Sequence, residues 1–589
     1  MKKRIWKSLL CVLTISTLMV GCAKNETSTQ APAEDTKQET TTEEVKEADQ
    51  EKEADVTLRD TAFGPVKGSV NEAKQTIEWK GVPYAKAPVG DLRWKAPQDP
   101  DNWTEVFDAT KDGNLGVQVA NGEVIGSEDC LNLDIYRPNT QDTSLPVVVF
   151  IHGGNNQSGK STEIIGSTLA NDTNSIFISL NYRLGVLGFN CLPALQTGDA
   201  NEDSGNYTLL DIAKALDWIH ANIEAFGGDK DNITISGFSA GGRDVMAMLI
   251  SPLFEGKFQK AISFSGGMTI ADTDASVKTI ATALAPLAVE DGKKADVEEA
   301  KEWLQTSDAE VKEYLYTLSA ERLAKVMMNA GIRMSVFPHI FNDGTVIPKE
   351  GFATTNYNSV PLLMLTSTSE FSFFAASDPY FAKEYGDGTL FTDETKNAEY
   401  TFANKYGSML YELFNAQESA ITMADNYKAP IYLTTISYGE NKEVVGDMAN
   451  LGAFHGVFVP LLDSDNATYQ AMFAEPYTFD GIKDLGKQFR SYIANFIKTG
   501  DPNEEGLVTW EQWSKDAAGQ TLVLDADKEK AMISMQDRTI SYDDVLKQIE
   551  ADTTISQEAK DTIVKQVLNG RWFSAQLDKH FNNESLWAK

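Results

Sequence analysis

Short β-rich runs alternate with longer helical patterns through the middle of this 589-residue chain. Residues 146–154 and 175–185 are continuous apolar runs that end in turn residues, as buried strands do. Residues 206–226 carry apolar side chains at spacings of three and four, which predicts a helix with one buried face. This alternation predicts an α/β fold with a mostly parallel central sheet flanked by helices on both faces.

The same pattern continues toward the C-terminus. Further strand candidates are residues 232–236, 260–264, 360–365 and 429–437. No internal repeat and no Pro/Gly/Ser-rich linker divides residues 61–589, so we expect one large domain there. The run from 548 to 582 is helical in pattern and forms a C-terminal segment of that domain.

The charge balance excludes several classes of partner. The chain has 86 Asp and Glu residues against 52 Lys and Arg, a net charge of −34. Phosphate binding needs clustered cations, so we expect no nucleic-acid partner and no docking on an anionic membrane surface. Among only four cysteines there is no CxxC pair, so we predict no metal site and no cofactor.

Residues 1–21 read as a targeting segment. A basic start precedes an apolar stretch that is too short to span a bilayer, and Gly21-Cys22 follows at once. This ending resembles a bacterial lipoprotein signal in which Cys22 is lipidated, although Met19 stands where that motif prefers Leu. An ordinary secretory signal is the alternative.

Residues 22–60 are predicted to be a tether. This stretch is acidic, has no aromatic residue and cannot bury enough apolar surface to offset the entropy of ordering. We therefore divide the chain into a signal peptide (1–21), a lipidated Cys with a disordered acidic tether (22–60) and a folded domain (61–589). The predicted location is extracytoplasmic, with a lipid anchor in the bacterial cell membrane. The sequence does not indicate the oligomeric state.

Residues 237–241 read Gly-Phe-Ser-Ala-Gly, a GxSxG motif. The motif follows a β-branched strand and opens an apolar helix, the context that a nucleophile elbow requires. Glycines are needed there because the turn is too sharp for side chains on either side of the serine. Ser239 is thus the candidate nucleophile, and a glycine-rich turn with a solvated serine is the alternative.

A second glycine-rich turn, residues 152–155, also follows a predicted strand. Backbone N–H groups in this turn and the N–H of Ala240 can face an oxyanion that develops on a substrate carbonyl. The alternative is a tight βα loop with no such role.

Longer landmarks around these turns resemble the type-B carboxylesterase family, which includes the cholinesterases. The landmarks stand in the family's order at residues 81–94, 128–138, 181–189, 205–242, 261–267 and 500–503. The resemblance covers roughly residues 61–540 and implies an α/β-hydrolase fold. It also implies hydrolysis of carboxylic esters by a Ser-His-Glu triad, with a small-molecule ester as the partner.

The base must be one of five histidines, because a serine hydroxyl needs a group to accept its proton. His455 matches the family's Ala-x-His-Gly loop, so we assign the base there, with a satisfied core histidine as the alternative. Local context makes the others weaker candidates: His152, His220, His339 and His580.

The acid is expected between the serine and the histidine in chain order. Glu370 ends an apolar strand and matches the family's strand-then-Glu landmark, whereas Asp343 is the runner-up and matches a structural turn. In the implied mechanism Ser239 attacks the ester carbonyl, His455 accepts its proton and Glu370 holds the imidazolium. Water then hydrolyses the acyl-enzyme.

The resemblance also implies supporting roles. Arg183 with Asp211, and Arg93 with Glu128, match structural ion pairs of the family, and Ser265 matches a serine in a hydrogen-bond network near the site.

The sequence departs from the family in and beside the predicted site. Phe238 stands where the family usually has Glu, which makes it a substrate-pocket candidate and the site less anionic; Asp244, at a usual Ser position, is not expected to replace the lost acid. The family's oxyanion donors map to Gly154, Asn155 and Ala240, with Asn155 in place of a third glycine. Asn tolerates positive φ better than most residues.

Two further departures concern a disulfide and the substrate. Cys130 has lost the partner of the family disulfide, so buried thiols at Cys130 and Cys191 are expected in place of an unusual bridge. Residues 105–127 contain no Trp, the residue that normally offers an aromatic face to a quaternary ammonium in that loop of the family, so choline esters are disfavoured. We expect an esterase for small neutral esters. A catalytically weak or silent binding or adhesion protein is the alternative, and a lipase a third possibility.

Overall fold

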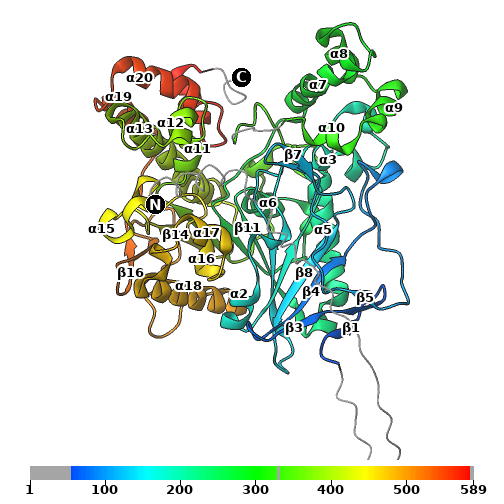
Figure 1. The fold of residues 1–589 in the computed structure, drawn as a ribbon, viewed down its shortest axis with the longest axis horizontal. Helices are drawn as coiled ribbons and strands as arrows, with labels where there is room; N and C mark the ends of the chain where they lie inside the picture. Colours follow the sequence, from blue (N-terminus) through cyan, green and yellow to red (C-terminus); the bar gives the residue numbers. More distant parts are fainter. Residues whose placement is uncertain (1–54, 328–331, 584–589) are drawn as a thin grey trace, which may run out of the picture.

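An eleven-stranded sheet runs through the protein in the order β16-β15-β14-β13-β12-β11-β9-β10-β8-β4-β3 (Figure 1). The computed structural model describes residues 55–327 and 332–583, so the predicted signal peptide and Cys22 lie outside the described residues. Parallel strands form its centre: β15 (Thr521–Ala526), β14 (Ile431–Ile436), β13 (Leu362–Ser367), β12 (Lys260–Phe264), β11 (Gly228–Phe238), β9 (Leu145–Ile151) and β10 (Ile176–Leu180).

Antiparallel strands complete both edges of the sheet. They are β16 (Ala531–Gln536) at one edge and β8 (Asn132–Pro138), β4 (Thr76–Pro83) and β3 (Ser69–Asn71) at the other. The parallel strands are buried on both faces, which explains their continuous Val, Ile and Leu runs. The predicted α/β fold with a mostly parallel sheet is confirmed.

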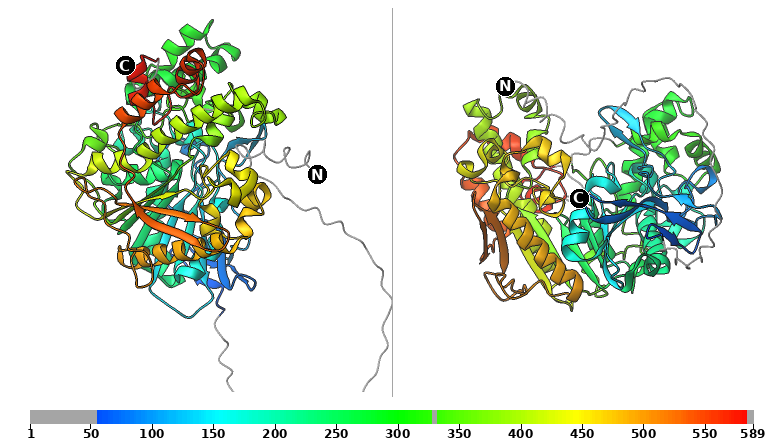
Figure 2. Two further views of the ribbon diagram at one scale, coloured as in Figure 1. Left: turned by 90° about the vertical axis from the view of Figure 1, so that its left-hand side faces the viewer. Right: turned by 60° about the horizontal axis from the view of Figure 1, so that its bottom comes forward.

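Helices cover both faces of this sheet. On one face α5 (Tyr207–Asn222) and α6 (Ala240–Met248) bury their apolar side chains in a core with β9, β10 and β11. On the other face α2 (Ser167–Thr173) and α18 (Asp480–Thr499) contribute to a second core. Figure 2 shows α18 lying beside the orange strands β15 and β16.

The first strand begins earlier than the sequence predicts. Strand β1 (Leu58–Asp60) pairs with β2 (Pro65–Lys67), although residues 58–60 were placed in the tether. Side-chain contacts explain the difference: the carboxylate of Asp55 accepts hydrogen bonds from the backbone N–H and hydroxyl of Thr57 and pairs with Lys67. The sequence of 55–60 is polar, so this ordering depends on long-range contacts that local composition does not reveal.

Two helical groups rise at the same end of the sheet (Figure 1). One contains α7 (Thr273–Glu290), α8 (Val297–Leu304), α9 (Ala309–Thr317) and α10 (Ala320–Ala324). The other joins α11 (Ser372–Ala376) and α13 (Glu394–Glu412) to the C-terminal helices α19 (Tyr542–Ala551), α20 (Gln557–Thr562) and α21 (Ala575–Phe581). Among the described helices, none combines the length and the apolar character that crossing a bilayer requires.

Candidate active site

Ser239 lies in the sharp turn between β11 and α6. Its backbone angles are φ 57° and ψ −113°, a conformation that non-glycine residues rarely adopt. A side chain on Gly237 would collide with the backbone of Gly241, and one on Gly241 would collide with the carbonyl of Ile151. The two glycines are therefore required by close backbone contact, and the turn presents Ser239 at the end of the central strands.

The loop after β14 brings His455 against Glu370, which follows β13. The Nδ1 atom of His455 lies 2.5 Å from Oε2 of Glu370. Glu370 is fully buried and His455 nearly so, since their side chains are 0% and 10% exposed. These two residues are more than eighty positions apart in the chain, and the parallel order of β13 and β14 brings their loops together.

Several donors hold the other oxygen of Glu370. Its Oε1 accepts hydrogen bonds from the hydroxyl of Ser265 at 2.6 Å, the hydroxyl of Thr366 at 3.1 Å and the backbone N–H of Ser367 at 2.9 Å. Burial by itself raises the pKa of Glu370, but the charge and hydrogen bond of His455 and the bonds from Ser265 and Ser367 lower that pKa below its ordinary value. The carboxylate is thus held ionised.

Aromatic rings enclose the imidazole of His455. The rings of Phe238, Phe374 and Tyr411 have centroids 4.8, 5.3 and 5.7 Å from its own. Its second nitrogen, Nε2, is buried and has no hydrogen-bond partner in the described chain, so Ser239 and His455 do not form a hydrogen bond in this structure. Hydrogen bonds of this kind often tighten only when substrate is bound.

Phe238 contacts the imidazole and does not lie open to solvent. Its side chain is buried, with the ring of Phe458 at 5.1 Å in an edge-on arrangement. The residue is predicted as a substrate-pocket candidate; the structure packs its ring against His455, and its contact with a substrate stays a prediction. Because it directly precedes Ser239, this contact brings the elbow and the imidazole loop together.

The turn after β9 carries the predicted oxyanion donors. Gly154 and Asn155 both have positive φ, 93° and 60°. In the described chain, no hydrogen bond is made by the backbone N–H groups of Gly154, Asn155 and Ala240. Gly241 packs on the carbonyls of Ile151 and His152, which brings Ala240 beside this turn. The three N–H groups are therefore available to an anion at the end of β9.

Glu163 was not predicted and lies against the same turn. Its carboxylate accepts the backbone N–H of Gly153 at 2.7 Å, and burial raises the pKa of Glu163 to about 7. A side chain on Gly153 would come close to both Glu163 and Ser239. No local sequence pattern marks Glu163, because it reaches the site across a loop.

Arg243 and Asp244, about one helical turn after Ser239, form a second charged region; Asp244 is noted above as a departure from the family, whereas Arg243 was not predicted to have a role. The guanidinium of Arg243 donates to Nε2 of His339 at 2.6 Å and approaches the side-chain oxygen of Asn155 at 3.4 Å. Asp244 accepts from Asn156 at 3.0 Å, and burial raises the pKa of Asp244 to about 7. The sequence signal that could have revealed this region is the adjacent charged pair Arg243 and Asp244 in an otherwise apolar helix.

The remaining histidines have structural partners. His152 stacks on Tyr182 with ring centroids 4.3 Å apart, and burial lowers the pKa of His152 to about 4. Burial and the charge of Arg243 hold the pKa of His339 well below its ordinary value. His220 contacts a backbone carbonyl 3.0 Å away, and His580 pairs with a glutamate on the surface. Asp343, the runner-up acid, bonds to the backbone of its own turn.

Other features implied by the resemblance are present. Arg183 pairs with buried Asp211 at 2.6 Å, and Arg93 pairs with Glu128 at 2.5 Å. Cys130 and Cys191 are free and buried, as expected, and burial raises the pKa of both thiols. Within residues 55–327 and 332–583, no group of three or more His, Cys, Asp or Glu is arranged to hold a metal ion.

Comparison with known proteins agrees with this geometry. Residues 52–396 match the carboxylesterase family, and over 494 residues the chain is 32% identical to the para-nitrobenzyl esterase of Bacillus subtilis (strain 168). The alignment covers 79% of this chain and 94% of that esterase. The chain belongs to the carboxylesterase family. This carboxylesterase is also 30% identical to mouse carboxylesterase 1E over 493 residues, which is 74% of this chain and 84% of the mouse protein.

Solved structures give the same result. A thermophilic para-nitrobenzyl esterase superposes on this carboxylesterase with a TM-score of 0.64 at 29% identity, covering 81% of this chain and 97% of the other. The predicted α/β-hydrolase fold and the predicted enzyme class, a serine carboxylesterase, are therefore confirmed. The silent-protein alternative is disfavoured, because these relatives are named as esterases.

Proposed function

We propose that this carboxylesterase cleaves small neutral esters through Ser239, His455 and Glu370. The contact between His455 Nδ1 and Glu370 Oε2 at 2.5 Å carries the proposal, because it leaves Nε2 of the imidazole as the nitrogen available to Ser239. A carboxylate bonded to Nδ1 fixes that tautomer and stabilises the imidazolium that forms.

The first half-reaction forms an acyl-enzyme. Nε2 of His455 accepts the hydroxyl proton as Ser239 Oγ attacks the carbonyl carbon, and the carbonyl oxygen becomes an oxyanion. The backbone N–H groups of Gly154, Asn155 and Ala240 stabilise that charge, and each such donor contributes roughly 3–4 kcal/mol. The imidazolium then gives its proton to the departing alcohol. In the second half-reaction water attacks the acyl group by the same route and releases the acid.

The neutral-ester preference rests on the lining of the imidazole. Phe238, Phe374 and Tyr411 surround His455, and Phe238 replaces a carboxylate at the position before the nucleophile. Without a carboxylate at position 238, a cationic alcohol group would have no charged partner there, so the site has no electrostatic reason to prefer cationic alcohol groups over uncharged ones.

A fluorophosphonate probe tests the triad directly. We expect stoichiometric labelling at Ser239 by peptide mass spectrometry, together with turnover of short p-nitrophenyl esters. His455→Ala should abolish labelling, whereas His220→Ala, which removes a histidine that only contacts a backbone carbonyl, should leave it intact. Absence of labelling and turnover in the folded wild-type protein would overturn the proposal.

We also propose that Cys22 is lipidated and anchors the enzyme outside the cytoplasmic membrane. The basic start, short apolar stretch and Gly21-Cys22 ending support this location. Full-length protein from a bacterial host should enter the detergent phase in Triton X-114 separation, and Cys22→Ser should move it to the aqueous phase. Equal partitioning of both forms would contradict lipidation.

A further inference from the structure

The buried arginines of the described chain differ in what neutralises them. Arg93, Arg183 and Arg571 pair with carboxylates, and Arg137 donates to four backbone carbonyl groups. Arg243 has neither kind of partner: no carboxylate in the described residues lies within ion-pair distance, and its Nε atom has no acceptor. Only 1% of this residue is exposed to solvent.

Such an arrangement is costly without a ligand. A guanidinium has five N–H donors, and burying its charge without an anion is strongly unfavourable. The acceptors present are Nε2 of His339, which is neutral, and the distant side-chain oxygen of Asn155. Asp244 attracts the charge of Arg243 but forms no ion pair with it: it bonds to Asn156, and burial raises its pKa to about 7 although the charge of Arg243 lowers it.

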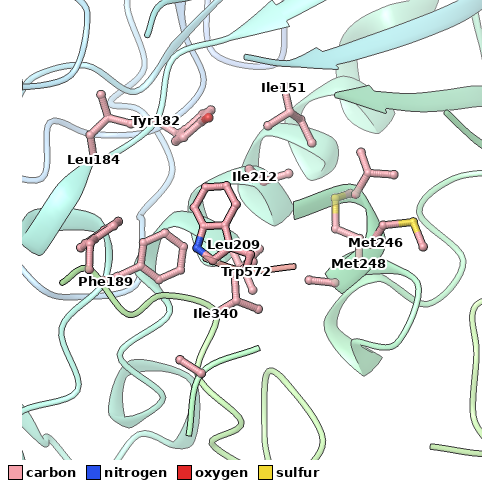
Figure 3. Close-up of a cluster of buried hydrophobic side chains, with 14 of the residues drawn as sticks. Ile151, Tyr182, Leu184, Phe189, Leu209, Ile212, Met246, Met248, Ile340 and Trp572 are labelled. Atoms are coloured by element: carbon pink, nitrogen blue, oxygen red, sulfur yellow. The ribbon is translucent and has the colours of Figure 1, made fainter. Parts of the chain in front are cut away.

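The surface beneath Arg243 is apolar and aromatic. The guanidinium carbon lies 3.2 Å from the ring centroid of Trp572, in a cation–π contact. Figure 3 shows this indole among apolar side chains that include Leu209, Ile212 and Met246. The side chains of this cluster are therefore apolar or aromatic. Two further buried donors, the hydroxyl of Tyr411 and the indole N–H of Trp572, also have no partner in the described chain.

The position of Arg243 favours contact with the acyl part of the substrate over contact with the alcohol part. Its backbone N–H donates to the carbonyl of Ser239 at 3.0 Å, and its side chain reaches the oxyanion turn at Asn155. The departing alcohol must lie at His455, which protonates it. Arg243 bonds to Asn155 of the oxyanion turn and makes no hydrogen bond to His455, which favours the acyl chain as the part of the substrate that a bound group belongs to.

We propose that Arg243 binds a carboxylate at the far end of the acyl group, so that half-esters of short dicarboxylic acids are preferred substrates. The inference rests on the proposed function and narrows its substrate class: the alcohol group stays neutral, but the preferred ester carries one negative charge on its acyl chain. Hydrolysis of such a half-ester consumes one water and yields the dicarboxylate, the alcohol and one proton. Arg243 is then a specificity-determining group that pairs with the substrate.

A matched pair of esters tests this assignment. Monomethyl succinate and methyl 4-methylpentanoate have nearly the same shape, with a carboxylate in one where the other has an isopropyl group. We expect kcat/KM, measured from released methanol, to be about 30-fold higher for the succinate ester, the range of a charge-assisted hydrogen bond. Arg243→Gln should bring the ratio to one or below, and Arg243→Lys should recover part of it.

The ratio of kcat/KM for the two esters is measured within one protein, so a partial loss of folded enzyme lowers both values equally and cancels. Arg322→Gln, which removes the same charge from a surface ion pair, should leave the ratio unchanged. Carboxymethyl butanoate, with its carboxylate on the alcohol, should show no Arg243-dependent preference. A wild-type ratio near one, or a ratio that survives Arg243→Gln, overturns the inference and leaves the proposed function standing. If no ester is cleaved, both are wrong.

Discussion

The two sides of Ser239 differ in how completely their polar groups are satisfied. On the base side, Glu370 accepts four hydrogen bonds, from His455, Ser265, Thr366 and Ser367, and its pKa is lowered. On the oxyanion side, Asp244 has one carboxylate oxygen without a partner in the described chain and a raised pKa. Both carboxylates are fully buried.

The difference shows which groups are ready before substrate arrives. A fully bonded carboxylate holds its imidazole in one orientation at all times, which is the preorganisation that proton transfer requires. The oxyanion side keeps N–H groups without hydrogen bonds and a guanidinium without an ion pair. These groups gain partners only when a ligand binds. Substitutions that disrupt each side separately should therefore lower kcat by different factors.

The largest loss of kcat is expected from Glu370→Gln. The amide keeps the shape of the side chain but removes the charge that holds the His455 tautomer and stabilises the imidazolium. We expect kcat for p-nitrophenyl butyrate to fall by about 10³–10⁴-fold with little change in KM. Steady-state kinetics at pH 8, with circular dichroism to verify the fold, measure this effect.

Asp244→Asn is the matched control for that substitution. It is the same chemical change in a second buried carboxylate, one helical turn from Ser239. Its kcat should stay within about threefold of wild type, because Asp244 contacts Asn156 and none of the reacting groups. Similar losses in both variants would mean that burial, and not the contact with His455, makes Glu370 important.

A smaller loss of kcat is expected from Asn155→Val on the oxyanion side. The residue has φ 60°, which a β-branched side chain adopts only with strain, so the backbone donor should move away from the oxyanion. We expect kcat to fall by about 10²-fold, the effect of losing one donor. Asn155→Gly, which adopts positive φ freely, should keep kcat within about threefold; equal losses in both variants would assign the effect to the Asn155 side chain.

The fold was predictable because its signals are local. Apolar runs marked β9, β10 and the later parallel strands, and the spacing of apolar residues marked α5. Boundaries were less accurate: the predicted strand 175–185 ends at Leu180, and the predicted helix 206–226 continues past Asn222 as a 3₁₀ turn. Sequence pattern alone does not distinguish the last residues of a strand from the buried loop that follows, here residues 181–184.

The site was predictable in part for the same reason. Ser239 has a local motif, whereas Glu370 and His455 were assigned through family resemblance together with chain order. Glu163 and Arg243 were missed because no sequence pattern shows that their side chains contact Gly153 and His339, although both partners lie in segments that the sequence analysis considered. A single sequence shows which residues are chemically unusual for their segment, but long-range packing decides what they contact.

A moderate effect is expected from Phe238→Glu, which adds a charge to the base side. Its ring lies 4.8 Å from the imidazole of His455, so a carboxylate there would stabilise the imidazolium. We expect the acidic limb of the kcat/KM profile to move up by about one pH unit, with about tenfold lower activity at pH 6. Phe238→Leu, which stays neutral, should not move that limb, and an unchanged profile in the Glu variant would show that this position does not influence the base.

The smallest effect, on stability alone, is expected from Asp244→Asn. Burial raises the pKa of Asp244 to about 7 from an ordinary value of 3.8, so the folded state binds a proton that the unfolded state has released between these two values. The folded protein therefore loses stability as pH rises through that window, by about 2–4 kcal/mol in total. Asn, which cannot ionise, removes this loss.

The variant and the wild type should have nearly the same thermal midpoint at pH 5, where Asp244 is protonated and resembles Asn. At pH 8 the variant should unfold about 2–4 °C higher at the same scan rate. Asp516→Asn, a substitution on the surface, should give equal midpoints relative to wild type at both pH values. The difference in thermal midpoint between Asp244→Asn and wild type should therefore depend on pH. A difference that is the same at pH 5 and pH 8 would mean that the charge of the Asp244 carboxylate is compensated in the folded protein, and the guanidinium of Arg243 would be the group that compensates it.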